Sequence, residues 1–373
     1  MNLFVIFLSI FSFLSITLFE GAVIIGLAYV AVVYIKKKKA PKGILIYPLL
    51  LHAVPTLLST LLYAPQLLGK AIERSIFLLL YLGGSEVKLT DKFLYQLNFL
   101  LVSVGFLLFP IVMYNYKYKA SIEPLWGGIF EVATFYSLFS LSALALWLKT
   151  RRVLWFFALL LFLSMVFFTL RRSTILGLLI TLLILLFLMR AIVKLRYTAL
   201  LISFSLLVGF FASYNFLQKD VRFQTLYKVI TGQVQLDSQT LDTISSLRWA
   251  NFVAGLGVIK EDIKEGKWLP LLTGHGIKPE TRLYLKPPAV GYESILFVSE
   301  FIEKGLIGLL AILWLYWRYY TYLLRYKIKE PLVIPFLLMP SVMFVGSLFT
   351  GFWDALLPLY FLWFKMIEEY EKS

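Results

Sequence analysis

The sequence predicts an all-α polytopic membrane protein with about twelve transmembrane helices and one large outer loop that contains helices of its own. Of the 373 residues, 60% are hydrophobic and 15% are charged, and the mean hydropathy is +0.83. An average soluble domain is about 45–50% apolar and about 25% charged. The apolar residues form runs of membrane-spanning length, and the basic residues cluster between those runs. These observations exclude a water-soluble enzyme and a disordered chain.

The apolar runs predict the membrane spans in chain order, because a membrane helix needs roughly 20 apolar residues. We expect spans at about 3–19, 21–35, 44–66, 72–84, 93–114, 127–148, 153–170, 174–190, 197–214, 293–317, 331–350 and 355–367. The second, fourth and last of these are short. No basic residues precede the first run and a second run follows at once, so we expect a span there and not a cleaved signal peptide.

The net charge of +15 reflects basic clusters that set the orientation of the chain. The clusters are Lys36 to Lys39; Lys149, Arg151 and Arg152; Arg190, Lys194 and Arg196; and Arg318, Arg325, Lys327 and Lys329. All four fall on the cytoplasmic side if both termini are inside. We therefore expect three parts, a bundle of about nine spans over 1–214, an outer loop over 215–292 and the closing spans over 293–373. A nucleic-acid partner is not expected.

Arg171 and Arg172 depart from this pattern, because they lie between the seventh and eighth spans on the outer side. One interpretation is that they reach lipid phosphates at the membrane surface. The other is an anion site, since guanidinium binds phosphate with two hydrogen bonds and keeps its charge. Ser173 and Thr174 could cap the start of the eighth span, and its N-terminal amides would add to a positive site.

The outer loop over 215–292 is the one long non-apolar segment, and it has ten basic and seven acidic residues. Residues 245–266 predict an amphipathic helix that Ser245 or Ser246 could cap and Gly266 could end. Arg248 would lie in its first turn, where the helix dipole repels a cation. An anion bound at that end would offset the repulsion. The alternative is a solvated surface arginine.

Two further residues are candidates for acid–base chemistry. His275 lies between two glycines in a predicted turn and could act as a general acid or base, or be only a polar turn residue. Glu293 stands at the outer end of the tenth span, where it could accept a proton from an attacking hydroxyl or hold Arg172 or Arg248 in place. The chain has no cysteine and two histidines, so we expect neither a metal site nor disulfides.

Four stretches together resemble the O-antigen ligase/polymerase family of bacterial envelope glycosyltransferases. The stretches are WGGIFEVATFYSLFSLSALALWL, TLRRSTILGLLITLLILLFL, SLRWANFVAGLGVIKEDIKEGKWLPLLTGHGIKP and YESILFVSEFIEKGLIGLLAILWLYW. They cover about residues 120–320. Arg172 matches the family arginine of the second stretch, and Arg248 matches that of the loop.

The resemblance implies a GT-C-like fold in the inner membrane of a bacterium, with the active site facing the periplasm. The implied reaction moves a glycan from an undecaprenyl diphosphate carrier to an acceptor, without a metal or other cofactor, in lipopolysaccharide biosynthesis. A ligase would use lipid A-core as the acceptor and a polymerase a lipid-linked glycan. Arg172 and Arg248, assisted by Arg171, would hold the diphosphate while an acceptor hydroxyl displaces it with inversion.

The sequence departs from the family ligases at the start of the closing span. The ligases usually have a histidine there, whereas this chain has Glu293 between a tyrosine and a serine, which looks more like some polymerases. The base could be Glu293 or His275, or catalysis could depend on the arginines alone. This departure favours a polymerase slightly over a ligase.

Two other classes remain open. A lipid-linked oligosaccharide flippase or transporter would show repeats or broken helices with buried charges. No repeat is evident, although three prolines interrupt the third span and His52 could line a groove there or be a packed, paired histidine. A cell-wall polymerase of the shape and division type would carry a catalytic aspartate in the outer loop, where Asp237 and Asp242 occur in a poorly patterned stretch.

Overall fold

The computed structural model describes residues 1–38, 41–189, 218–283 and 295–371, together with residues 203, 204, 207, 211 and 214. The described residues form fifteen α-helices and four 3-10 segments, and none of them is in a strand. The predicted all-helical class is confirmed. Most of the predicted span at 197–214, the basic cluster of 190–196 and the candidate base Glu293 lie outside the described residues.

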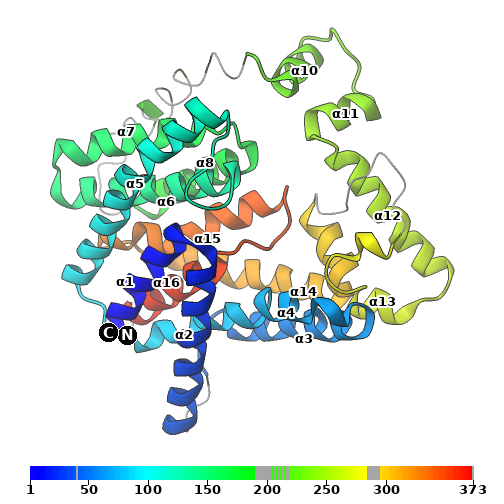
Figure 1. Ribbon diagram of the computed structural model, residues 1–373, viewed down its shortest axis with the longest axis horizontal. Coiled ribbons are helices and arrows are strands. Elements are labelled where there is room, and N and C mark those ends of the chain that lie inside the picture. Colours follow the sequence, from blue (N-terminus) through cyan, green and yellow to red (C-terminus); the bar gives the residue numbers. More distant parts are fainter. Residues whose placement is uncertain are drawn as a thin grey trace.

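The N-terminal part forms a bundle of helices (Figure 1). Its α-helices are α1 (Asn2–Leu14), α2 (Ile16–Lys37), α3 (Ile46–Tyr63), α4 (Leu68–Glu73), α5 (Asp91–Lys119), α6 (Ile129–Thr150), α7 (Val153–Phe168) and α8 (Arg172–Leu188). The most enclosed of these is α6, which packs against α5, α7, α8 and α15 (Ile334–Ser347). Two of its buried hydroxyls, those of Ser137 and Ser140, donate to the carbonyls of Ala133 and Tyr136 one turn earlier. The core therefore centres on α6.

The outer loop forms an arm of shorter helices beside the bundle (Figure 1). They are α10 (Val221–Ile230), α11 (Ser238–Ser245), α12 (Arg248–Lys264) and α13 (Trp268–Thr273). The predicted amphipathic helix is confirmed as α12, and Gly266 follows its end with a φ of 66°. After the arm, α14 (Leu296–Arg325), α15 and α16 (Leu357–Tyr370) return to the bundle.

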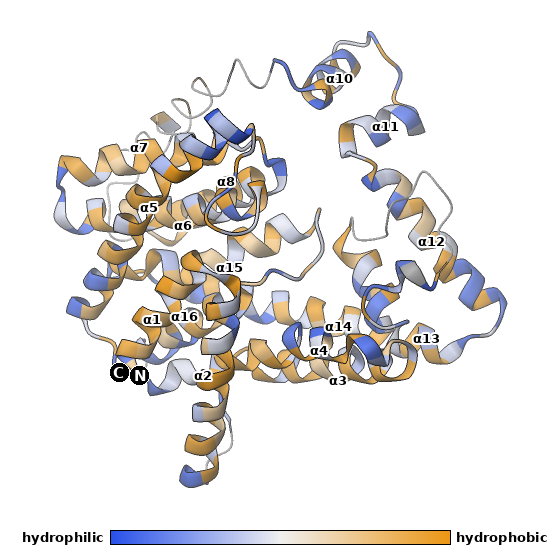
Figure 2. Cartoon of the chain, in the orientation of Figure 1, coloured by the Kyte–Doolittle hydropathy of each residue, from blue (hydrophilic) through white to orange (hydrophobic). Residues whose placement is uncertain are grey.

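Four helices are long and apolar enough to cross a membrane, namely α2, α3, α5 and α6. Shorter apolar helices cover Asn2–Leu14, Val153–Phe168, Arg172–Leu188 and Pro331–Ser347. Figure 2 shows that apolar residues dominate the bundle helices, whereas polar residues are frequent on α10 to α12. The described residues are therefore helical and include four helices that could span a membrane.

The predicted fourth span at 72–84 differs in the structure. The chain forms α4 and then a 3-10 segment, η2, over Ile76–Glu86. One cause of this difference is the close packing of η2 on α16. The two segments approach so closely that a Cβ at Gly84 would lie 2.6 Å from the carbonyl oxygen of Leu362. A 3-10 helix rises about 2.0 Å per residue, so these few residues extend further than an α-helix would.

The predicted tenth span is also interrupted. Within α14, Gly305 has non-helical angles of φ 65° and ψ −168°. The loop after α13 packs on this break, where the N–H groups of His275 and Gly276 donate to the carbonyls of Ile302 and Glu303 at 2.7 and 3.0 Å. The break therefore frees two carbonyls, and the outer arm occupies them.

Candidate functional site

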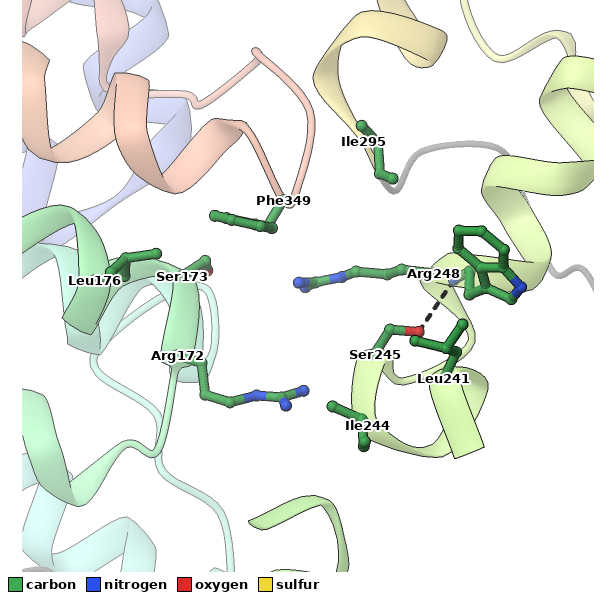
Figure 3. Close-up of a pocket in the computed structure, with 10 residues that line it drawn as sticks. Arg172, Ser173, Leu176, Leu241, Ile244, Ser245, Arg248, Ile295 and Phe349 are labelled. Atoms are coloured by element: carbon green, nitrogen blue, oxygen red, sulfur yellow. Dashed lines mark hydrogen bonds between the residues drawn. The ribbon is translucent and has the colours of Figure 1, made fainter. Parts of the chain in front are cut away.

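A cavity of about 360 Å³ separates the bundle from the outer arm, and two arginines enter it from opposite sides (Figure 3). Arg172 comes from α8 and Arg248 from α12. The cavity, which we call the arginine pocket, is lined by Arg172, Ser173, Leu176, Leu241, Ile244, Ser245, Arg248, Trp249, Ile295 and Phe349. The predicted pairing of Arg172 with Arg248 at one place is therefore present in the fold.

The turn between α7 and α8 places Arg172 at the pocket. Leu170 has a φ of 52°, and the N–H of Arg171 donates to the hydroxyl of Thr169 at 3.3 Å. The expected caps are wrong, because α8 begins at Arg172 with Arg171 as its N-cap and without a side-chain cap. Ser173 and Thr174 are buried inside the first turn instead.

A sharp junction between α11 and α12 places Arg248. Ser246 and Leu247 both have positive φ, at 58° and 65°, which redirects the chain. Residues of α11 then satisfy the first amides of α12. The hydroxyl of Ser245 accepts from the N–H of Trp249 at 3.0 Å, the bond drawn in Figure 3. Ser245 thus satisfies an amide of the first turn, as expected, although the N-cap residue itself is Leu247. Arg248 lies in the first turn as predicted.

A third arginine, Arg222 at the start of α10, belongs to the same group. The guanidinium groups of Arg172 and Arg222 both donate to the hydroxyl of Ser246, at 3.4 and 3.5 Å. Asp220 caps α10 through the N–H of Arg222 and pairs with its side chain, with an Nε–Oδ1 distance of 2.8 Å. In the sequence, Arg222 is one of the ten basic residues of the loop and nothing in its hydropathy pattern marks it. A capping aspartate two residues before an arginine was the available signal.

The group carries more positive than negative charge. Asp220 already pairs with Arg222, which holds the pKa of that carboxyl below its usual range. In the described part of the chain, no carboxylate forms an ion pair with Arg172 or Arg248. Burial, and then the nearby charges of Arg171, Arg172 and Arg222, lower the pKa of Arg248 to about 10. An anion in the pocket would relieve this repulsion.

Apolar side chains form the remaining walls of the arginine pocket. Leu176 lies beside Arg172 on α8, Leu241 and Ile244 belong to α11, and Phe349 closes another side (Figure 3). The pocket thus combines fixed cations with hydrophobic contact area. A ligand with a charged head and an apolar chain matches this combination.

Arg171 and His275 are not among the residues that line the arginine pocket. The guanidinium of Arg171 lies over the ring of Phe130, 5.0 Å from its centre. His275 pairs with Asp262, with 2.7 Å between Nε2 and Oδ2. Asp262 follows Arg248 by 14 positions in α12, which at 1.5 Å per residue is about 21 Å along the helix. His275 therefore lies at the opposite end of α12 from the arginines.

A second polar group, which was not predicted from the sequence, lies where α3 meets α14. This α3–α14 cluster consists of His52, Arg74, Glu300, Glu303 and Lys304. Glu300 contacts His52 at 3.2 Å and Lys304 at 2.6 Å, and Arg74 contacts Glu303 at 3.2 Å. All but Arg74 are buried. The sequence signal for this cluster was the presence of Glu300, Glu303 and Lys304 within an apolar predicted span.

Across the described ranges, no group of three or more histidine, aspartate or glutamate side chains is placed to hold a metal ion. The charged groups described above are arranged as ion pairs and hydrogen bonds. The chemistry that this part of the chain offers at the arginine pocket is that of fixed guanidinium groups.

Comparison with known proteins gives a relative that matches this chain over nearly its whole length. An "Uncharacterized protein" of Aquifex aeolicus (strain VF5) is 39% identical over 376 residues, covering 97% of this chain and 95% of that protein. The chain belongs to the family of that Aquifex protein. No family model matches the chain, and no solved structure matches it. Because the family likeness runs over nearly the whole length, the bundle and the outer arm both belong to it.

Proposed function

We propose that the protein is a membrane glycosyltransferase of the O-antigen ligase/polymerase type. It would move a glycan from an undecaprenyl diphosphate carrier to an acceptor sugar. The observation that carries the proposal is the meeting of Arg172 and Arg248, without carboxylate partners among the described residues, in a pocket with apolar walls. Paired guanidiniums suit a diphosphate, and the apolar walls suit the lipid that bears it.

The proposed topology has twelve spans with both termini inside. Contacts between distant segments support it, because segments expected in the cytoplasm meet one another. Lys37 pairs with Glu86 at 2.6 Å, Lys149 pairs with Glu330, and Tyr370 donates to Asp91 at 2.7 Å. The α7 helix then leads from this end to the arginine pocket. The pocket would therefore face the periplasm of a cell with an inner membrane.

The proposed reaction is an in-line displacement. An acceptor hydroxyl attacks the anomeric carbon, the bond from that carbon to the diphosphate oxygen breaks, and the hydroxyl proton passes to a base. Negative charge grows on the leaving diphosphate, and Arg172 and Arg248 would stabilise it in the transition state. This step needs no metal or other cofactor and inverts the anomeric centre.

Glu293 remains our candidate for the base, and it lies outside the described residues. His275 receives less support, because its partner Asp262 lies about 21 Å along α12 from Arg248. The acceptor distinguishes the two forms of the proposal. A ligase would use lipid A-core, and a polymerase would use a second lipid-linked glycan.

A lipid-linked oligosaccharide flippase is the second candidate, and one observation favours it. The α14 helix is broken at Gly305, and the α3–α14 cluster places buried charges beside that break. Transporters commonly use broken helices with charged groups in this way. These features lie at the far end of α12 from the arginine pocket. A transporter would move the carrier without forming a new glycosidic bond.

The test is a transfer assay with purified protein in detergent, EDTA and undecaprenyl-diphosphate oligosaccharide, with and without lipid A-core. Arg172→Ala and Arg248→Ala are compared with Lys264→Ala, which removes an exposed cation from the other end of α12. We expect a loss of about 100-fold or more for each arginine variant and wild-type activity for the control. Longer lipid-linked glycans without core identify a polymerase, and product only with core identifies a ligase. No transfer by the wild type, or activity unchanged in both arginine variants, would overturn the proposal.

A further inference from the structure

A second basic cavity, of about 530 Å³, lies where the chain leaves the C-terminal end of α14. Its cations are Arg325, Lys327 and Lys329, and the ring of Tyr370 closes it from α16. It shares no residue with the arginine pocket. We call it the α14-end cavity.

Alternation of exposure shows how the three cations come to lie together. Tyr326 leaves the helix with extended angles of φ −68° and ψ 136°. Tyr326 and Ile328 are buried, whereas Arg325, Lys327 and Lys329 are exposed. In an extended chain alternate residues project to one side, about 6.6 Å apart. The buried pair therefore anchors the segment, and the cations form a row along the cavity.

The nearby carboxylates already have partners. Glu330 pairs with Lys149, and its other oxygen accepts the N–H of Leu332 at 3.1 Å. Glu371 accepts the hydroxyl of Tyr322 at 2.7 Å. Over the described residues, no carboxylate forms an ion pair with any of the three cations. Three cations and two carboxylates line the cavity, and one of the carboxylates, Glu330, is already paired with Lys149, so the lining keeps a net positive charge.

We propose that the α14-end cavity binds the phosphate group of an anionic glycerophospholipid from the cytoplasmic leaflet. Basic pockets between helices on this side of a membrane hold such head groups, and Tyr326 and Tyr370 are side chains of the kind that lie at head-group depth. A free phosphate compound offers the same chemistry, so the test separates the two sources. The assignment to the cytoplasmic side rests on the proposed topology, and the binding itself does not depend on glycosyl transfer.

The experiment measures phospholipid retained by the purified full chain, using native mass spectrometry in detergent. The probes are phosphatidylglycerol, phosphatidylcholine and, separately, inorganic phosphate. The test variant carries Arg325→Gln, Lys327→Gln and Lys329→Gln. The matched control carries Lys36→Gln, Lys38→Gln and Lys42→Gln, which removes three exposed cations from the side expected to be the same. Lys327→Gln alone serves if the triple variant does not fold.

We expect the wild type and the control to retain phosphatidylglycerol in preference to phosphatidylcholine. The test variant should bind it about 100-fold more weakly, and Lys327→Gln should show a partial loss. Added inorganic phosphate should not displace the lipid. Equal loss in the control, or equal retention of phosphatidylcholine, would overturn the proposal. Binding of inorganic phosphate with displacement of the lipid would overturn the lipid assignment. Transfer activity would fail or persist independently of these results.

Discussion

Arg172 of the helical bundle and Arg248 of the outer arm point into one cavity from opposite sides (Figure 3). Arg172 belongs to α8 and Arg248 to α12, and within the described residues neither forms an ion pair with a carboxylate. Holding two such groups together costs free energy, because like charges repel and burial removes water. The pocket is therefore arranged for a ligand that supplies negative charge to both parts at once.

Replacing Arg248 should stabilise the ligand-free protein. The pKa of Arg248 is about 10 in the folded state, below its ordinary value of 12.5. The folded protein thus holds this proton less tightly than the unfolded chain, and the resulting penalty disappears as pH rises from about 10 to 12.5. At neutral pH we expect Arg248→Gln to raise the free energy of unfolding by about 1 kcal/mol, after discounting for solvent screening.

The measurement is thermal unfolding in detergent, with and without pyrophosphate. Wild-type protein should gain stability from pyrophosphate, whereas Arg248→Gln should gain much less. Lys264→Gln, at the exposed end of the same helix, should behave as the wild type. A ligand-free Arg248→Gln protein that unfolds at a lower temperature than the wild type would contradict the electrostatic argument.

Much of the arginine pocket could be predicted from the sequence. Arg172 stood out because it breaks the pattern of basic residues, and Arg248 because a helix dipole disfavours a cation in the first turn. Arg222 could not be found in this way, since its place depends on the junction at Ser246, whose hydroxyl accepts from both Arg172 and Arg222. That is a contact between segments, and the hydropathy of a segment does not encode it.

In the overall fold, too, local sequence patterns predict some features, whereas contacts between distant segments decide others. The all-helical class and α12 follow from composition and periodicity. The 3-10 segment η2 and the break at Gly305 do not, because an apolar run looks alike in a straight, broken or tightened helix. Packing between segments determines both features. The η2 segment packs on α16, and the Gly274–Gly276 turn packs on α14.

His275 should matter for the attachment of the outer arm and not for chemistry. It pairs with Asp262 and donates its backbone N–H to Ile302 at 2.7 Å, far along α12 from Arg248. We expect His275→Gln to keep transfer activity within about twofold, since the loss of one such side-chain pair costs only about 1 kcal/mol. Asp262→Asn should give a similar small loss of stability. A loss of activity as large as in Arg172→Ala, with unchanged stability, would instead restore His275 as a catalytic candidate.

Gly274 should tolerate no side chain. Its φ is 84°, and an added Cβ would lie 2.2 Å from the backbone of Glu303. Gly274→Ala should therefore detach the turn from α14 and lower stability by several kcal/mol, as overpacking and strain both act. Gly232→Ala is the matched control, because Gly232 also has a positive φ, of 74°, but open space around it. The control should lose about 1 kcal/mol from strain alone. Proteolysis of the outer arm and thermal unfolding would separate the two, and equal losses would show that packing at Gly274 is unimportant.

Asp354, in the connection between α15 and α16, should give the protein a pH-dependent stability. Burial raises the pKa of this carboxyl to about 7, and the negative charge of Glu131 adds to the effect. The folded protein then binds the proton more tightly than the unfolded chain, whose aspartate titrates near 3.8. The contribution of Asp354 to the free energy of unfolding is therefore fully present below pH 3.8. It is lost as the pH rises towards about 7, with a slope of up to about 1.4 kcal/mol per pH unit.

Asp354→Asn tests this directly, because an amide oxygen can still accept the N–H of Leu356 that Asp354 accepts at 2.8 Å. The variant should flatten the rise of unfolding temperature that the wild type shows as pH is lowered from 7 to 5. Asp237, the N-cap of α11, has its pKa lowered by the backbone N–H of Thr240, so Asp237→Asn should leave that rise in place. An unchanged pH profile in Asp354→Asn would mean that the carboxyl stays ionised in the fold, and would contradict the argument from burial.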